Sequence, residues 1–256
     1  MVEQKNFTLV ILQARMSSSR FPGKVMMPIN GEPMIYRQIE RIEEASVVDS
    51  LIVATSTDSS DDVLAGYLKA KGVQVFRGSL ENVLSRFLEI EAQIQPTTII
   101  RLTGDCPLVM PELIDKMVVR FYDSNVDYLS NTLEPTFPDG LDIEILKASA
   151  LRKLGTFKLS AAEREHVTLG IYRRPLEFSL ENYRGHQDLS KNRWTVDYFQ
   201  DLEFVRQVFI NFEGEESKFS FEDTMIFLAN NKDIKSAISS DRRNEKLGGM
   251  GVEESL

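Results

Sequence analysis

Cationic and hydroxyl side chains are concentrated in one short stretch near the amino terminus. Within ten residues the chain carries two arginines, three serines and a lysine: Arg15, Arg20, Ser17, Ser18, Ser19 and Lys24. Guanidinium, ammonium, hydroxyl and backbone amide groups are the donors that bind polyphosphates. Neither GxxxxGK[ST] nor GxGxxG is present here, so the stretch is not one of the common glycine-rich phosphate loops. A solvated surface turn is the alternative interpretation.

Two aspartates that follow apolar runs are candidates for holding a cation. Asp105 ends the run 97–105, directly after Gly104, and Asp197 ends the run 194–197. A pair of carboxylates at the edge of a sheet can hold magnesium against phosphate oxygens. A turn-forming role is the alternative for Asp105. Asp201, in the first turn of the next predicted helix, is given a structural role.

The elements that must position these residues alternate between strands and helices. The run 7–13 is apolar and β-branched and predicts a buried parallel strand, so the basic stretch becomes a loop at the carboxyl edge of a sheet. Further strands are predicted at 50–56, 73–76, 97–105, 127–131, 141–146, 177–182 and 194–197, and helices at 34–44, 63–71, 82–93, 112–122, 199–211 and 219–230. This alternation is typical of an α/β fold with three layers and a mostly parallel sheet. We expect one domain over residues 1–238, an insertion at about 127–184 that leaves the parallel core and returns, and a polar tail at 239–256.

Composition excludes several classes of protein. The 256 residues include 30 basic and 39 acidic side chains, for a net charge of −9, which argues against a partner such as duplex nucleic acid or an anionic membrane. The hydrophobic share of 42% is typical of a globular protein, and no apolar run approaches the length of a membrane span. The polar amino terminus predicts no signal peptide, so we expect a cytoplasmic protein. The single cysteine, Cys106, leaves no internal disulfide.

The run QARMSSSRFPGK resembles the amino-terminal signature of the CTP-dependent sugar cytidylyltransferases, the family of the CMP-octulosonate (CMP-Kdo) and CMP-sialate synthetases. Octulosonate members read roughly IPARxxSxRLPGK. The likeness is closer to the spore-coat polysaccharide branch, of SpsF type, in which glutamine replaces the proline before the alanine. Further runs resemble motifs of this family in the same order: FRGSLENVLSRF, GDCPLV, FPDGLDIEIL, EREHVT and TVDYFQDLE.

The resemblance implies a Rossmann-like nucleotidyltransferase fold, also called the nucleotide-diphospho-sugar transferase fold, with a small inserted dimerisation or acceptor subdomain. It implies Asp105 and Asp197 as ligands of Mg²⁺, and Lys24, Arg20 and Asp105 as catalytic residues. The implied substrate-binding residues are Ala14, Arg15, Ser17, Ser18, Ser19, Gly23, Gly78, Ser79, Asn82, Arg86, Asp142, Glu144 and His166. Asp142 and Glu144 alternate with isoleucines, so they either bind acceptor hydroxyls or form an exposed strand face. A structural role is the alternative for His166.

The resulting hypothesis is a magnesium-dependent cytidylyltransferase that transfers CMP from CTP to a sugar-type acceptor for surface polysaccharide or glycoconjugate biosynthesis, and acts as a homodimer. The attacking group is either the anomeric hydroxyl of a keto-sugar acid or the phosphate of a sugar or polyol phosphate. Two alternatives remain. A nucleotide-sugar-dependent glycosyltransferase of similar fold is disfavoured because Cys106 and Pro107 follow Asp105, so a DxD pair is missing there. A non-catalytic nucleotide-binding protein is disfavoured by the presence of Lys24, Asp105 and Asp197.

Overall fold

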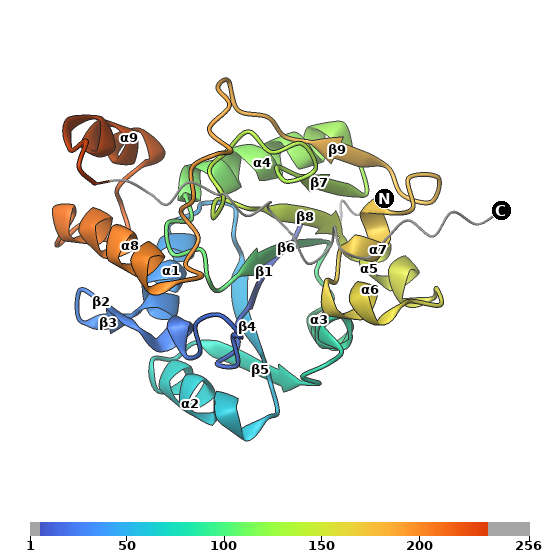
Figure 1. Ribbon diagram of the computed structural model, residues 1–256. Coiled ribbons are helices and arrows are strands. Elements are labelled where there is room, and N and C mark those ends of the chain that lie inside the picture. Colours follow the sequence, from blue (N-terminus) through green and yellow to red (C-terminus); the bar gives the residue numbers. More distant parts are fainter. Residues whose placement is uncertain (1–5, 235–256) are drawn as a thin grey trace.

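A seven-stranded sheet forms the centre of the molecule. The computed structural model describes residues 6–234. The strands lie in the order β5-β4-β1-β6-β8-β7-β9 (Figure 1). Their bounds are β1 Thr8–Gln13, β4 Ser50–Ser56, β5 Gln74–Gly78, β6 Thr98–Thr103, β7 Tyr128–Ser130, β8 Glu144–Lys147 and β9 Leu180–Asn182. Of these strands, β8 alone runs antiparallel to both neighbours, and the remaining pairs are parallel. The predicted mostly parallel sheet is confirmed.

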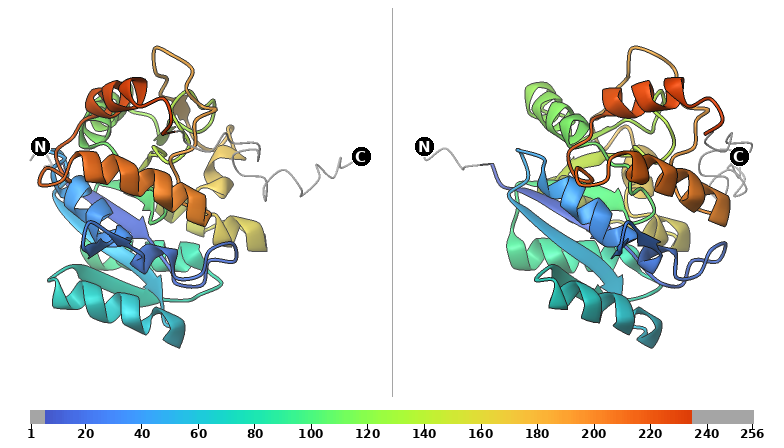
Figure 2. Two further views of the ribbon diagram at one scale, coloured as in Figure 1. Left: turned by 60° about the vertical axis from the view of Figure 1, so that its left-hand side comes forward. Right: turned by 90° about the vertical axis from the view of Figure 1, so that its left-hand side faces the viewer.

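Helices cover both faces of this sheet and make three layers, as Figure 2 shows from two sides. One face packs against α1 Met34–Glu43, α2 Asp62–Ala70, α4 Pro111–Ser124 and α8 Phe199–Asn211, with α9 Phe221–Asn230 beside α8. The other face packs against α3 Val83–Ile94, α5 Ala148–Gly155 and α7 Leu169–Tyr172, and α6 Ala161–Glu165 packs on α3. Short pieces complete the fold: the 3₁₀ turns Lys24–Met26 and Ser59–Asp61, and the hairpin of β2 Pro28–Ile29 with β3 Glu32–Pro33.

The sequence of β1 explains its central place in the sheet. Val10 and Leu12 are buried against the helices of the first face, and Leu9 and Ile11 against those of the second. Successive side chains of a strand point to opposite faces, so a strand with helices on both sides must be apolar at every position. Gln13 ends this run as a half-buried polar residue.

The predicted strand at 194–197 is wrong. These residues form an irregular segment with bends at Thr195 and Asp197, next to an isolated bridge between Asp139 and Arg193. Gly140 has a φ of 110°, and a Cβ atom there would lie 2.4 Å from the amide nitrogen of Thr195, so the two loops pack backbone against backbone. Trp194 and Val196 are buried, which produces a strand-like pattern without a ladder.

The segment 127–184, expected to be an insertion, lies at one end of the sheet. Its strands β7, β8 and β9 extend the central sheet beyond β6, while α5 and α7 pack against the sheet and α6 packs on α3. The strand expected at 141–146 begins only at Glu144. The predicted tail at 239–256 lies outside the described residues.

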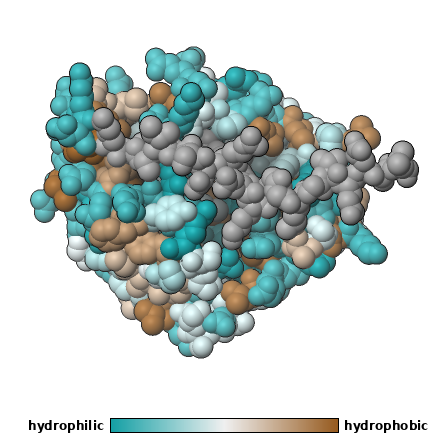
Figure 3. All heavy atoms as spheres, viewed as in Figure 1, coloured by the Kyte–Doolittle hydropathy of each residue, from teal (hydrophilic) through white to brown (hydrophobic). Residues whose placement is uncertain are grey.

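The outer surface is mixed in character. On the face seen in Figure 3, hydrophilic side chains predominate and hydrophobic ones gather in small groups. Within residues 6–234 the helices are too short or too polar to cross a membrane.

Candidate active site

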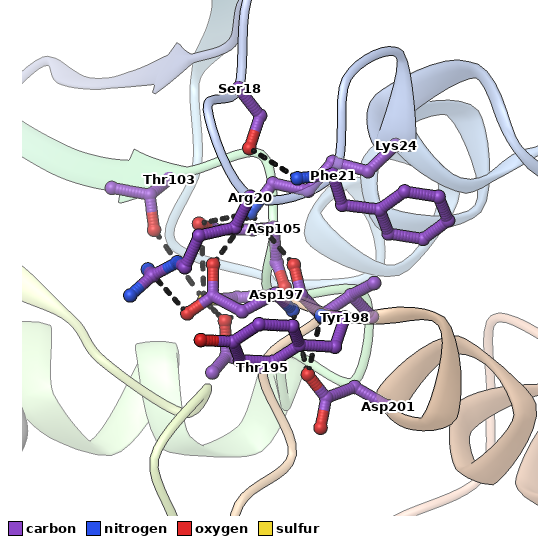
Figure 4. A network of polar contacts seen from close by, with 12 residues as sticks. Ser18, Arg20, Phe21, Lys24, Thr103, Asp105, Thr195, Asp197, Tyr198 and Asp201 are labelled. Atoms are coloured by element: carbon purple, nitrogen blue, oxygen red, sulfur yellow. Dashed lines mark hydrogen bonds and ion pairs between the residues drawn. The ribbon is translucent and has the colours of Figure 1, made fainter. Parts of the chain in front are cut away.

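The ammonium group of Lys24 joins the two aspartates that the sequence singled out. Lys24 Nζ lies 3.0 Å from Asp105 Oδ2 and 3.0 Å from Asp197 Oδ1, and it donates to the main-chain oxygen of Val196 at 2.7 Å (Figure 4). Lys24 begins the turn after the basic loop, Asp105 follows β6, and Asp197 precedes α8. Three distant parts of the chain therefore meet at one cation, and the predicted convergence of the two carboxylates is confirmed.

Charge explains why Asp105 and Lys24 are ionised at neutral pH. Burial alone would raise the pKa of Asp105, but the charge of Lys24 and hydrogen bonds from Thr103, Lys24 and Cys106 bring it to about 2. Burial alone would lower the pKa of Lys24, but the two carboxylates outweigh burial and hold it above its ordinary value. Opposite charges in contact each favour the ionised form of the other.

Asp197 is held on both its side chain and its backbone. Arg20 Nη2 donates to Asp197 Oδ2 at 2.6 Å. Asp201, which is 2% exposed, accepts through one oxygen, Oδ2, from the amides of Asp197 (2.9 Å) and Tyr198 (2.8 Å) and from Arg193 Nη2 (2.7 Å). Asp201 thus fixes the backbone that carries Asp197 as well as the start of α8.

The basic loop is anchored at its base by a buried carboxylate. Asp61 is fully buried and accepts from the amide of Met16 at 2.7 Å and from the amide of Ser56 at 3.1 Å. At the far end of the loop Gly23 adopts a φ of 73°, a conformation that glycine tolerates readily, and its amide donates back to the Met16 oxygen at 2.8 Å. These contacts fold the loop back on itself, so that its cationic side chains face the carboxylates.

Arg86 on α3 is the second cationic feature of the site. Its guanidinium is fully buried, Nη1 donates to the Ala54 oxygen at 3.2 Å, and Nε and Nη2 have no hydrogen-bond partner among the described residues. Burial, with a further contribution from Arg15, lowers the pKa of Arg86 to about 10, so it remains charged at neutral pH. A buried donor without a partner is costly, which favours a binding role for these two groups.

Three other predicted residues support Arg86. A Cβ atom at Gly78 would lie 2.7 Å from Arg86 Cγ, so glycine leaves room for the arginine stem. Asn82 is the N-cap of α3 and accepts from the Ser85 amide at 3.1 Å. Ser79 Oγ accepts from the Asn82 amide at 3.0 Å. The run GSLENVLSR thus builds the helix start that carries Arg86.

One cavity brings the loop, the carboxylates and Arg86 together. Of the predicted site residues, its lining contains Ala14, Arg15, Ser18, Ser19, Arg20, Lys24, Arg86, Asp105, His166 and Asp197. Ser17, Gly23, Gly78, Ser79, Asn82, Asp142 and Glu144 are outside this lining. The cavity is also lined by Gly104, which directly precedes Asp105, and by residues that the sequence did not single out: Gln13, Val25, Val83, Thr103 and Glu165. Glu165 is the last residue of α6, and its carboxylate lies 3.9 Å from Arg15 across the cavity.

Glu144 is not on an exposed strand face. It is 7% exposed, forms an ion pair with Arg101, and accepts from Tyr128 at 2.6 Å and from Thr168 at 2.5 Å. The prediction of an exposed strand face is therefore wrong for Glu144, because its carboxylate binds Arg101, Tyr128 and Thr168. Asp142 is half-buried and lies just before β8.

The donor set suits the expected magnesium ion. Two carboxylates and a main-chain oxygen already share one cationic group, Lys24, and hard oxygen donors are the ligands that Mg²⁺ prefers. Among the described residues no group of three or more histidine, cysteine or acidic side chains is gathered for a metal. Phosphate oxygens of a substrate would therefore complete the coordination.

The sequence contains only weak signals for the residues of the site that were not predicted. Asp61 stands among helix-start residues, where an aspartate reads as an ordinary cap. Gln13 directly precedes the loop but ends an apolar strand, and its neighbour Thr103 ends another. Glu165 carries no local signal, because only the packing of α6 brings it to the cavity.

Comparisons with known proteins agree on one family. Residues 9–234 match the family model described as cytidylyltransferase. The spore coat polysaccharide biosynthesis protein SpsF of Bacillus subtilis is 33% identical over 247 residues, covering 92% of this chain and 100% of that protein. The structure of a cytidylyltransferase from Leptospira borgpetersenii has a TM-score of 0.84 at 31% identity, covering 90% of this chain and 97% of that one. CMP:2-keto-3-deoxy-manno-octonic acid synthetase complexed with CTP has a TM-score of 0.64 at 18% identity, covering 80% of this chain and 99% of that one, which shows the shared nucleotidyltransferase fold.

Proposed function

The chain belongs to the cytidylyltransferase family, and from that premise we propose that it transfers CMP from CTP to a sugar-type acceptor with release of pyrophosphate. The observation that carries this proposal is the meeting of Asp105, Asp197 and Lys24 at the cavity that the basic loop also lines. Nucleotidyl transfer depends on positioning and charge neutralisation and needs no protein nucleophile. The buried Cys106 therefore needs no catalytic role.

The carboxylates and the basic loop divide the work on the triphosphate. Asp105 and Asp197 would hold Mg²⁺, which when bound neutralises charge on the phosphate under attack. Arg15 and Arg20 donate to the outer phosphates and bind the departing pyrophosphate. Lys24, which lies at the same carboxylates, would donate to a phosphate oxygen of the bound triphosphate.

Arg86 is assigned to the nucleotide. Within residues 6–234 its Nε and Nη2 donors have no partner. Arg86 lines the cavity from α3, which follows the edge strand β5, whereas Asp105 follows β6. A base that presents acceptor atoms along its edge would satisfy both donors at once. Cytosine offers such an edge through its ring nitrogen and its carbonyl oxygen.

The reaction joins an acceptor oxygen to the α-phosphorus of CTP. The oxygen attacks in line, the bond between the α-phosphorus and the bridging oxygen breaks, and pyrophosphate leaves with that oxygen. A hydroxyl acceptor also loses its proton. We propose a keto-sugar acid or a sugar or polyol phosphate as the acceptor, in the biosynthesis of a surface polysaccharide or glycoconjugate. The name of the SpsF relative, which refers to spore coat polysaccharide biosynthesis, supports this choice.

The experiment that tests the function is a pyrophosphate-release assay with Mg²⁺ and a panel of acceptors. The acceptors are 3-deoxy-manno-octulosonate, N-acetylneuraminate and glycerol 3-phosphate, each with CTP, ATP, GTP or UTP. We expect release with CTP and at least one acceptor, and at least tenfold less with the other nucleotides. If none of the acceptors gave pyrophosphate release with CTP, that result would contradict the proposal.

We further propose a cytoplasmic homodimer. Leu176 lies after α7 within the segment 127–184 and is 98% exposed, which suits a contact with a second copy of the chain. Light scattering at micromolar concentration should give twice the mass of one chain, and a monomeric mass would contradict the dimer.

A further inference from the structure

Gln13 lines the cavity, but the proposed function assigns it no role. It is the last residue of β1, in register with Ala54 of β4 on one side and Thr103 of β6 on the other. Its main-chain oxygen accepts from the amide of Gly104 at 2.8 Å, and Gly104 directly precedes Asp105. Gln13 therefore lies next to the backbone that leads into Asp105, and it lines the same cavity.

The contact with Arg101 fixes which way the side-chain amide of Gln13 points. Arg101 Nη2 donates to Gln13 Oε1 at 3.3 Å. A guanidinium has donors and no acceptor, so the oxygen of the amide must face Arg101. The amide nitrogen, Nε2, makes no hydrogen bond with any residue in the part of the chain that the structure describes. It is the atom that remains available to a ligand in the cavity.

A buried chain of contacts holds Arg101 in that position. Arg101 forms an ion pair with Glu144, and Glu144 in turn accepts from Tyr128 and Thr168. Burial alone would lower the pKa of Arg101, but Glu144 outweighs burial and keeps the pKa above its ordinary value. The permanent charge of Arg101 thus keeps the Gln13 amide in one orientation.

We propose that Gln13 contacts the acceptor substrate and that its Nε2 donates a hydrogen bond to a hydroxyl or carboxylate oxygen of that acceptor. This inference rests on the proposed function. The cationic side chains that suit phosphates come from the basic loop and α3, whereas the wall formed by the end of α6 carries Glu165 and His166. A neutral amide donor suits the hydroxyl and carboxylate oxygens of a sugar acceptor, whereas the cationic side chains suit the triphosphate.

Two variants separate this role from a structural one. Gln13→Glu keeps the shape and an oxygen for Arg101 but removes the donor, and Gln13→Met removes the donor without adding charge. Gln74→Glu is the matched control, because Gln74 is exposed at the start of β5. Each protein is assayed for pyrophosphate release with Mg²⁺, CTP and the three acceptors named above, with KM determined separately for CTP and for the acceptor.

We expect both Gln13 variants to raise the acceptor KM at least tenfold, with Gln13→Glu the more severe on an anionic acceptor, while the KM for CTP changes less than twofold. Gln74→Glu should match the wild type. An unchanged acceptor KM, or an equal rise in the KM for CTP, would overturn the inference while the wild type remains active. A wild type that is inactive with every acceptor overturns the proposed function first, and the inference with it.

Discussion

Asp105 and Asp197 each place one carboxylate oxygen 3.0 Å from the same nitrogen, the ammonium of Lys24. The positive charge between the two carboxylates offsets their mutual repulsion. In this structure that cation belongs to the chain itself. The two side chains are therefore held together at one point before any nucleotide binds, which is the preorganisation that a phosphoryl-transfer site requires.

Lys24→Met should make the fold dependent on a divalent cation. The change leaves two carboxylates and the Val196 oxygen without their shared partner, and breaking a buried ion pair costs about 3–5 kcal/mol. We expect a lower Tm without metal, and a larger rise in Tm on adding Mg²⁺ than the wild type shows. Lys116→Met, on the exposed side of α4, is the control. Equal Mg²⁺ effects in wild type and Lys24→Met would contradict this account.

Asp201→Asn should weaken the metal site indirectly. The substitution removes the charge that accepts from two backbone amides and Arg193, so the backbone of Asp197 is held less firmly. We expect the Mg²⁺ concentration for half-maximal rate to rise about tenfold, as outer partners of metal ligands commonly cause. Asp223→Asn removes a similar charge from the capping box of α9 and should leave that concentration unchanged. A loss of Tm in both variants without a change in Mg²⁺ demand would show a purely structural role for Asp201.

Arg86→Met should separate binding from stability. Two donors of Arg86 have no partner in the part of the chain that the structure describes, so the substitution removes a buried charge that is not part of an ion pair there. We therefore expect the KM for CTP to rise at least tenfold while the free energy of unfolding falls by no more than about 1 kcal/mol, the worth of the one hydrogen bond to Ala54. Arg184→Met, at an exposed ion pair with Glu134, should change neither quantity. A large loss of stability with an unchanged KM would refute the nucleotide role.

The ionised Glu163 side chain should stabilise the protein near neutral pH, and this stabilisation should be lost in acid. Burial alone would raise the pKa of Glu163, but hydrogen bonds from Arg174 and Ser160 outweigh burial and hold it below its ordinary value. The folded protein then binds fewer protons than the unfolded chain, so this stabilisation is present above about pH 4.3 and is lost as the pH falls through the lowered pKa. Thermal melts between pH 6 and pH 3 should show a smaller loss of Tm for Glu163→Gln than for the wild type. Parallel curves would contradict the assignment.

Local pattern predicted much of the fold and the centre of the site. The apolar run before Gln13 and the alternation of strands and helices predicted β1 and the parallel half of the sheet, because a strand buried on both faces must be apolar throughout. The basic loop and Asp105 follow such strands directly, so their place at one sheet edge follows from topology.

Contacts between distant segments limited the rest of the prediction. Trp194 and Val196 alternate like strand residues, but they are buried in the core without belonging to a strand, and hydrogen-bond ladders leave no mark in a single sequence. Arg101 lies opposite Glu144 because β8 runs antiparallel beside β6. The direction of a strand does not change its apolar pattern, so this pairing could not be predicted from the sequence. For the same reason the orientation of Gln13 was accessible only from the structure.

The most direct test of the shared-cation site is Mn²⁺ binding followed by electron paramagnetic resonance in the presence of CTP. It compares the wild type with Asp105→Asn and Asp197→Asn, and with Asp123→Asn on the exposed face of α4 as the control. We predict that the wild type and the control bind Mn²⁺ together with CTP, and that either site variant weakens this binding at least tenfold. Unchanged Mn²⁺ affinity in both site variants would contradict the claim that Asp105 and Asp197 hold one divalent cation between them.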